Sequence, residues 1–334
     1  MHYPSVSVVI ITYNEERNIG GCLESVLSIE YLREKYEVIV VDSSIDATSS
    51  IVKRYPGVKL INSPEKNFAL SRNIGVAHAQ YNLIAFTDAD CRVPKDWLRI
   101  LVGNFNNGEI AGVGGNAYPP PGSKYLGKCI ACLGLPAGGA IGLDAHLKEV
   151  DGSVNTLSTC NAIFKKEAII GVGGFDERLI YGCEDEDIIN RMREKGLRVK
   201  YDINSYVFHN TRDNIWDFFK WSFRRGIADY NVRQPSILKI TRDPFSLLWP
   251  LIGISVLTLL GSINLMIIPL SLLLLYFLLL GGMFLGTKKF RLLISRRKKI
   301  KIDLVSIFSV IPALFYLRRV GMNAGKMWGR VRWS

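Results

Sequence analysis

The strongest constraint on this 334-residue chain is a run of 44 residues without a charged side chain, from 244 to 287. A helix that crosses the hydrocarbon core of a bilayer needs only about 20 residues. The run therefore predicts a transmembrane helical hairpin over 244–287, with the segment 261–264 (Gly-Ser-Ile-Asn) as the turn between two helices. Two crossings would return the chain to the side from which it entered.

All of the excess positive charge follows this run. The net charge is +12, yet 13 of the 42 basic and one of the 30 acidic side chains lie in 288–334, so residues 1–287 carry 29 of each. Basic residues beside a membrane segment mark its cytoplasmic side and bind anionic headgroups. A nucleic-acid-binding protein carries its basic patch on the folded domain. The pattern predicts a multi-pass protein of the cell membrane with lipids as partners and no nucleic acid.

Two more segments are expected to contact the bilayer. Residues 214–243 begin with mixed aromatic and basic side chains, which is typical of an amphipathic helix in the membrane interface. In the basic tail 288–334, the uncharged stretch 304–317 is short for a span and contains Pro312, which should kink a helix. We expect a third membrane-embedded segment at about 303–320 that is re-entrant or tilted, because a full crossing would carry five basic side chains outside.

Residues 1–213 have the pattern of an α/β domain. Short apolar strand candidates alternate with helical patterns, and these candidates are 5–11, 37–42, 58–62 and 82–90. Alternation of this kind predicts a mostly parallel sheet with flanking helices. Ligands bind beyond the carboxyl ends of such strands. The polar residues at those ends are Thr12, Tyr13, Glu15, Asp42, Asp88 and Asp90.

Two acidic motifs suggest chemistry. Asp88 and Asp90, one residue apart at a strand end, can hold a hard divalent cation that neutralises a diphosphate, or can simply be solvated turn acids. Asp42 can accept hydrogen bonds from a nucleobase or a ribose. The four acids 184–187 suit the start of a helix, but their mutual repulsion also makes one of them a suitable general base.

The cysteines indicate no disulfide framework. All six are scattered, and no basic segment precedes the first apolar run, so the globular part of the chain is expected in the cytoplasm with reduced thiols. Cys129 and Cys132 form a lone CxxC without a second pair, which favours a structural pair over a zinc or redox site. Gly112-Val113-Gly114 is followed by prolines instead of a helix, so a nicotinamide-binding fold is not expected.

Four segments in register, namely 7–19, 37–52, 69–98 and 161–196, resemble family 2 glycosyltransferases with a GT-A fold. The resemblance covers about 5–210 and is closest in architecture to membrane-attached members, the cellulose-synthase-like and dolichyl-phosphate mannose synthase-like enzymes. It implies a GT-A nucleotide-diphospho-sugar transferase fold in 1–213, followed by an α-helical membrane domain.

The resemblance also implies residue roles. The nucleotide would contact Thr12, Tyr13, Glu15, Asp42, Arg72 and Asp88. Asp88, Asp90 and His209 would bind Mg²⁺ or Mn²⁺, although His209 also fits a packed residue at a strand end. Asp185 would be the catalytic base, with Glu184 beside it. Further candidates for contacts to the diphosphate or the acceptor are Arg224, Arg225 and Asn161.

At two places the sequence differs from the usual motifs of this family. The segment after Asp42 lacks the glycine usual in the family, which puts the contacts of that loop in doubt but not Asp42 itself. The Gln-x-x-Arg-Trp motif of processive polymerases is absent, and residues 220–226 occupy its place, so a polymerase is disfavoured.

The resemblance therefore implies an inverting hexosyltransferase with a nucleotide-diphospho-sugar donor, first GDP-mannose and second a UDP-sugar. The expected acceptor is a polyprenol-linked saccharide at the cytoplasmic membrane face. Two alternatives remain: transfer to a polyprenyl phosphate, and a membrane receptor that binds nucleotide sugars without catalysis.

Overall fold

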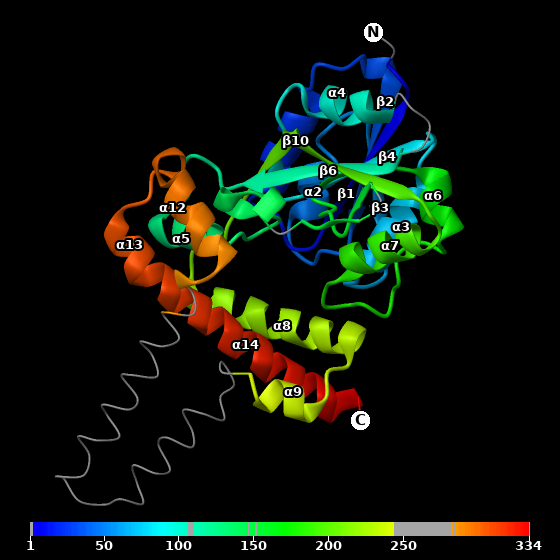
Figure 1. The fold of residues 1–334 in the computed structure, drawn as a ribbon. Coiled ribbons are helices and arrows are strands. Elements are labelled where there is room, and N and C mark those ends of the chain that lie inside the picture. The colour runs from blue at the N-terminus through cyan, green and yellow to red at the C-terminus, as the bar shows by residue number, and fades with distance from the viewer. Residues whose placement is uncertain are drawn as a thin grey trace, which may run out of the picture. The chain divides into compact units, whose positions relative to one another are not determined.

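The computed structural model describes residues 3–105, 110–145, 147–150, 152–243, 282 and 285–333. The chain forms two compact units, each described by itself: the first comprises 1–123 and 134–211, and the second comprises 124–133 and 212–334 (Figure 1). The hairpin expected over 244–287 lies outside the described residues except for 282 and 285–287. The domain boundaries drawn around it stay predictions.

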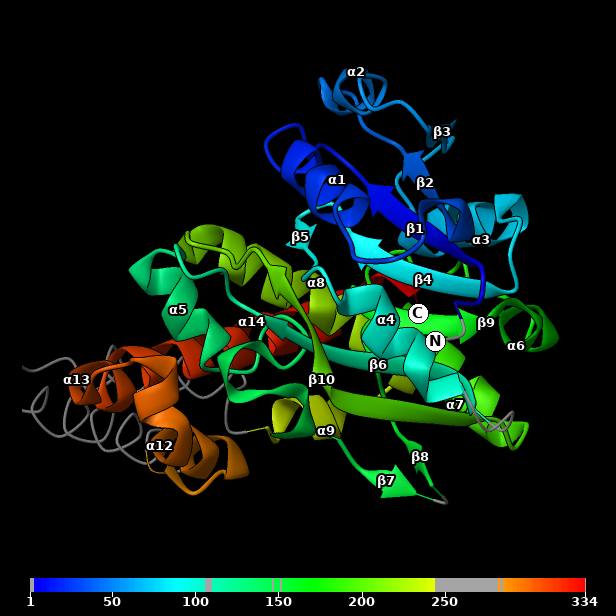
Figure 2. The same cartoon turned by 90° about the horizontal axis from the view of Figure 1, so that it is seen from above.

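The first unit is built on an eight-stranded sheet in the order β3-β2-β1-β4-β9-β6-β10-β5 (Figure 2). In chain order its strands are β1 Val6–Thr12, β2 Tyr36–Asp42, β3 Val58–Asn62, β4 Leu83–Asp88, β5 Cys91–Arg92, β6 Ile110–Tyr118, β9 Asn161–Lys165 and β10 Arg198–His209. A separate two-stranded ribbon pairs β7 Glu149–Val150 with β8 Ser153–Val154.

The sheet is mixed. The four parallel pairings are β1–β2, β1–β4, β2–β3 and β6–β10. Strand β9 runs antiparallel to both of its neighbours, β4 and β6, and the short β5 runs antiparallel to β10. An antiparallel strand begins at the edge where its neighbours end. The start of β9 therefore lies beside the carboxyl end of β4.

Helices cover both faces of this sheet. They are α1 Ile19–Leu27, α2 Thr48–Val52, α3 Phe68–His78, α4 Trp97–Val102, α6 Lys166–Gly171 and α7 Glu184–Glu194. Val8 and Ile10 of β1 join an apolar cluster with α1, α2 and α4, whereas Val9 and Ile11 join another with α3, α6 and α7. Every residue of β1 is buried, which explains why five of its seven residues are apolar. The 3₁₀ turns are Arg33–Lys35, Gly103–Phe105, Gly139–Ile141 and Leu143–Ala145.

The described part of the second unit is helical. Its helices are α5 Tyr125–Ala131, α8 Ile215–Arg233, α9 Ile237–Thr241, α12 Lys288–Ile300, α13 Leu304–Phe308 and α14 Val310–Trp333. Asn214 caps α8 by accepting hydrogen bonds from the backbone of Trp216 and Asp217. Cys129 and Cys132 are both buried at α5.

Helices α8 and α14 pack side by side at glycines (Figure 1). A methyl group on Gly325 would lie 1.9 Å from the carbonyl oxygen of Phe223, and one on Gly226 would lie 2.0 Å from that of Met322. Only glycine permits backbones to approach this closely. Gly321, Gly325 and Gly329 recur at every fourth position, so they lie on one face of α14.

Within the residues that the structure describes, one helical stretch, Leu304–Arg332, is long and apolar enough to cross a membrane. This stretch is interrupted at Ser309: α13 ends at Phe308 and α14 begins at Val310, which places Pro312 in the first turn of α14. Proline is tolerated in the first turn of a helix, where its missing N–H needs no partner. That the segment 303–320 is membrane-embedded stays a prediction.

Candidate active site

Two carboxylates and an imidazole meet where β4 and β10 end. Asp88 is the last residue of β4, Asp90 follows it, and His209 is the last residue of β10. Oδ2 of Asp88 lies 3.6 Å from Nε2 of His209, and Oδ2 of Asp90 lies 3.6 Å from Nδ1 of the same ring. The backbone N–H of Asn210 donates to the carbonyl oxygen of Asp90 at 3.1 Å, which fixes the two segments together.

The charges of this cluster are complementary. Burial lowers the pKa of His209, but the carboxylates of Asp90 and Asp88 outweigh it and raise this pKa to about 10. Burial raises the pKa of Asp88, but His209 and Arg72 outweigh it, so the net shift is downward. Two carboxylates and an imidazole are donors that suit Mn²⁺ or Mg²⁺. The residues present therefore fit the expected cation.

Arg72 connects this cluster to the acidic start of α7. Its guanidinium is buried on α3, and Nη1 donates to Oε1 of Glu184 at 2.8 Å while Nη2 lies 3.6 Å from Oδ1 of Asp88. Burial lowers the pKa of Arg72, but Glu184, Asp185 and Asp88 outweigh it and raise that pKa further. Glu184 is therefore engaged in an ion pair with Arg72.

Asp185 is oriented by the segment that precedes β9. The hydroxyl of Thr159 donates to its Oδ1 at 2.9 Å, and the backbone N–H of Thr159 and the hydroxyl of Ser158 lie 3.4 and 3.5 Å from its Oδ2. Cys183, just before α7, has a φ of +73°, so the chain turns sharply into the helix. These contacts hold the carboxylate in one orientation.

Of the six residues expected to hold the nucleotide, Thr12, Tyr13, Glu15 and Asp42 lie at or just after the ends of β1 and β2. Asp42 is buried and accepts hydrogen bonds from the backbone N–H of Ser44 at 3.0 Å and from the hydroxyl of Ser49. The ammonium group of Lys66 lies 3.7 Å from the ring centre of Tyr13. Among the residues described, the hydroxyl of Thr12 is one of the buried polar groups without a hydrogen-bond partner, so it is free to bond to a ligand.

Glu15 has an unusual pKa for a carboxyl group near this edge. Burial and the charge of Asp90 raise its pKa to about 7, against the lowering effect of a hydrogen bond from Asn18. That bond, from Nδ2 of Asn18 to Oε2 of Glu15, is 2.6 Å long. Asn18 in turn accepts from Nδ2 of Asn210 at 2.8 Å. The loop after β1 is thereby connected to Asn210, which follows His209 and contacts the backbone of Asp90.

Of the three further candidates, only Asn161 lies in the first unit. The side chain of Asn161 is fully buried and accepts from Nε1 of Trp97 at 2.8 Å and from the hydroxyl of Ser205 at 3.1 Å. Its amide donates to the carbonyl oxygen of Asn116, so its polar groups are used within the core. Arg224 and Arg225 lie on α8, in the second unit.

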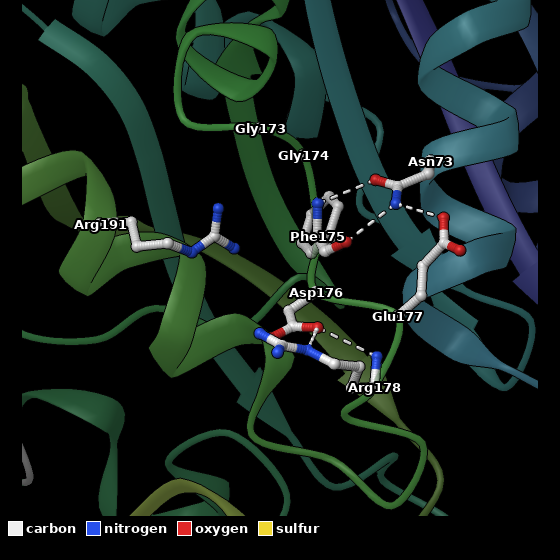
Figure 3. A pocket seen from close by; sticks show the side chains of 8 residues that line it. All are labelled: Asn73, Gly173, Gly174, Phe175, Asp176, Glu177, Arg178 and Arg191. Atoms are coloured by element: carbon white, nitrogen blue, oxygen red, sulfur yellow. Dashed lines mark hydrogen bonds and ion pairs between the residues drawn. The ribbon is translucent and has the colours of Figure 1, made fainter.

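The sequence interpretation missed two positioning residues. Thr159 gave no signal, because a threonine before a short strand is common. Asn73, beside Arg72, fixes α3 to the loop before α7 by accepting from the backbone of Phe175 at 2.8 Å and donating to its carbonyl at 2.9 Å (Figure 3). Its amide also donates to Glu177 at 2.8 Å, at a pocket lined by Gly173, Gly174 and Arg191 among others. The adjacent glycines in that loop were the available signal.

This mixed sheet, with acidic residues at the end of β4 and a carboxylate at the start of α7, defines a glycosyltransferase of the GT-A fold. The chain belongs to the family 2 glycosyltransferases: residues 7–171 match the model of "Glycosyl transferase family 2", and residues 143–209 match "N-terminal domain of galactosyltransferase". The family and the fold class expected from the sequence are confirmed.

Curated relatives and solved structures agree with this assignment. Glycosyltransferase AglE of Haloferax volcanii is 28% identical over 75% of this chain and 81% of its own length. Poly-beta-1,6-N-acetyl-D-glucosamine synthase of Staphylococcus aureus is 29% identical over 59% of this chain, and the match spans only 48% of the synthase. Mannosyltransferase PcManGT from Pyrobaculum calidifontis has a TM-score of 0.62 and 20% identity over 98% of this chain and 88% of its own. TarS 1-349 of S. aureus has a TM-score of 0.51 and 16% identity over 98% and 92%.

Proposed function

We propose that this glycosyltransferase is an inverting, metal-dependent enzyme that transfers a hexose to a lipid-linked saccharide at the cytoplasmic face of the cell membrane. The observation that carries the proposal is the position of Arg72, whose guanidinium faces Asp88 on one side and Glu184 on the other. The buried guanidinium of Arg72 thus connects Asp88, one of the proposed metal ligands, to the first turn of α7, which contains Asp185.

The residues of the site divide the reaction between them. When bound by Asp88, Asp90 and His209, Mg²⁺ or Mn²⁺ supplies positive charge beside the departing diphosphate. Asp185, held by Thr159, accepts the proton from the acceptor hydroxyl as its oxygen attacks the anomeric carbon from the opposite face. A single displacement inverts that carbon without a covalent intermediate.

The donor we propose to test first is GDP-mannose. The mannosyltransferase from P. calidifontis, which shares the fold, was solved in complex with GDP-Man and Mn²⁺. Buried Asp42 and the unpartnered hydroxyl of Thr12 supply an acceptor and a polar group for a base and ribose. Because a carboxylate accepts from guanine and uracil alike, a UDP-sugar is the second candidate.

The lipid-linked acceptor is supported by the surface of the second unit. Several of its large apolar side chains are more than half exposed to solvent, namely those of Trp216, Leu238, Val305, Phe308 and Val331. Exposed apolar side chains on basic amphipathic helices are typical of an interface with lipid. A polyprenyl phosphate is the alternative acceptor.

Calorimetry on the full chain in detergent tests the central claim. We expect GDP-mannose or a UDP-sugar to bind in the presence of Mn²⁺, and Asp90→Asn to abolish the metal-dependent part of this binding. Transfer is then measured to a polyprenyl-diphosphate saccharide and to a polyprenyl phosphate. The absence of binding by every nucleotide sugar would overturn the proposal, and binding without any transfer would favour a receptor.

A further inference from the structure

Two cysteines lie against the acidic residues of the site. Cys91 is directly opposite His209 in the antiparallel pairing of β5 with β10. Thr87 is opposite Asn161 in the pairing of β4 with β9, so the adjacent residues Asp88 and Cys160 meet at the end of that ladder. One ligand atom from each of Asp88, Cys91, Cys160 and His209 lies within 4.8 Å of all the others.

The two cysteines of this cluster are buried, and strand pairing fixes the backbone around them. Cys91 and Cys160 are 0% and 1% exposed, and both are free thiols. Asp88 is the adjustable member, because its side chain is 28% exposed. Its Oδ1 faces Arg72, while its Oδ2 faces the imidazole of His209, so one oxygen is directed toward the cluster.

The donor set has the chemistry of a zinc site. Zinc is typically bound by four ligands from cysteine, histidine and carboxylates, with bonds of about 2.0–2.3 Å. The corners of such a tetrahedron are roughly 3.3–3.8 Å apart by that geometry, so the present spacing requires a contraction of about 1 Å. Thiolates select soft or borderline cations over Mg²⁺ and Mn²⁺.

We propose that Asp88, Cys91, Cys160 and His209 form a site for a thiophilic divalent cation such as Zn²⁺, distinct from the hard-cation set Asp88, Asp90 and His209. Two ligands belong to both sets, so one ion excludes the other. Binding releases the two thiol protons and one proton of the His209 imidazolium to solvent, and it leaves the cysteines unoxidised. That Zn²⁺ thereby inhibits transfer rests on the proposed function, whereas the site itself does not.

Cobalt spectroscopy on the metal-free, reduced full chain tests the site directly. We expect one equivalent of Co²⁺ to give a thiolate-to-metal charge-transfer band and the visible bands of tetrahedral cobalt, which Zn²⁺ removes and Mn²⁺ does not. Cys91→Ala and Cys160→Ala should each weaken cobalt binding by on the order of 100-fold or more and lower the charge-transfer intensity. Cys132→Ala removes a buried thiol elsewhere and should leave the spectrum unchanged.

Two outcomes overturn the proposal: cobalt bound without a charge-transfer band, or a band whose intensity is undiminished in both single variants. If an alanine variant fails to fold, Cys91→Ser and Cys160→Ser replace it. The charge-transfer intensity of each serine variant should then be lower than that of the wild type, because two thiolates contribute more intensity than one. Release of Mn²⁺ by added Zn²⁺, followed by electron paramagnetic resonance, tests the exclusion. A cobalt band in a protein that binds no nucleotide sugar would refute the proposed function and leave the site standing.

Discussion

The strand-end site of the first unit and the helix pair α8–α14 of the second unit use buried charge differently. In the site, Arg72 pairs with Glu184 and Asp88, and Asp88 also faces His209, so charges form a chain between elements that the sheet already holds. In the helix pair, backbones touch at glycines, and one cluster, Asp229 with Arg233 and Lys326, accompanies that contact. Substitutions should therefore alter activity in the first region and stability in the second.

The largest effect is expected for Asp185→Asn. The amide cannot accept the acceptor proton, so transfer to a hydroxyl should fall by about 10²–10⁴-fold while the donor dissociation constant changes little. Steady-state transfer and donor calorimetry measure the two quantities. Glu186→Gln, in the same helical turn, is the matched control and should keep most of the activity. Undiminished turnover in Asp185→Asn would indicate a phosphate acceptor, which needs no base.

A smaller but purely structural loss is expected for Gly325→Ala. The new methyl group meets the carbonyl of Phe223, so α14 must move away from α8, at about 1–3 kcal/mol of stability. Thermal unfolding in detergent measures this loss. Gly171→Ala is the control, because a methyl group there meets nothing within 4 Å. Equal melting temperatures for the two variants would show that the helices do not depend on close contact.

Asp229→Asn tests the charge cluster of the same helix pair. Asp229 accepts from Lys326 at 2.8 Å and Arg233 at 3.0 Å, and its removal leaves the nearly buried ammonium of Lys326 without this carboxylate. We expect a loss of about 1–3 kcal/mol. Asp217→Asn, whose side chain is 62% exposed and 3.9 Å from Lys220, should cost less than about 0.5 kcal/mol. A larger loss of stability in Asp217→Asn than in Asp229→Asn would contradict this prediction.

The last effect is a pH dependence, and it concerns Glu15 in the metal-free protein. Its folded pKa of about 7 exceeds its ordinary value of 4.5, so the folded state binds more protons between these values. Glu15 therefore favours folding below pH 4.5 and progressively loses that contribution as the pH rises to 7. Glu15→Gln should flatten this decline in unfolding experiments across the window, and Glu16→Gln should not. A wild-type profile without the decline would contradict the assignment.

The sequence predicted the half of the sheet that its local pattern encodes. β1, β2 and β4 are apolar runs bounded by polar residues, so Asp42, Asp88 and Asp90 could be placed at strand ends before the structure was known. The helix beginning at Glu184 was equally visible from its four acids. These elements depend on residues that are close in the sequence, so the local pattern of apolar and polar residues was sufficient to predict them.

The other half depends on distant pairings. β9 is only five residues long, and nothing in those residues shows that they run antiparallel between β4 and β6. Thr159 and Cys160 lie at the site because β9 pairs between β4 and β6. Their contacts therefore could not be predicted from the sequence. The glycines of α14 were visible at their four-residue spacing, but their partner helix was not.

The place of β9 also dictates an order of assembly. β6 leaves the ribosome before β9, yet its two neighbours in the sheet, β9 and β10, are both synthesised later. During translation, β6 must therefore wait unpaired within this sheet, while β1 to β4 can already join one another. Because contacts between distant segments form slowly, the nucleotide side of the site can take shape early. Asp185, the proposed base, obtains its Thr159 contact only after both β9 and α7 have been synthesised.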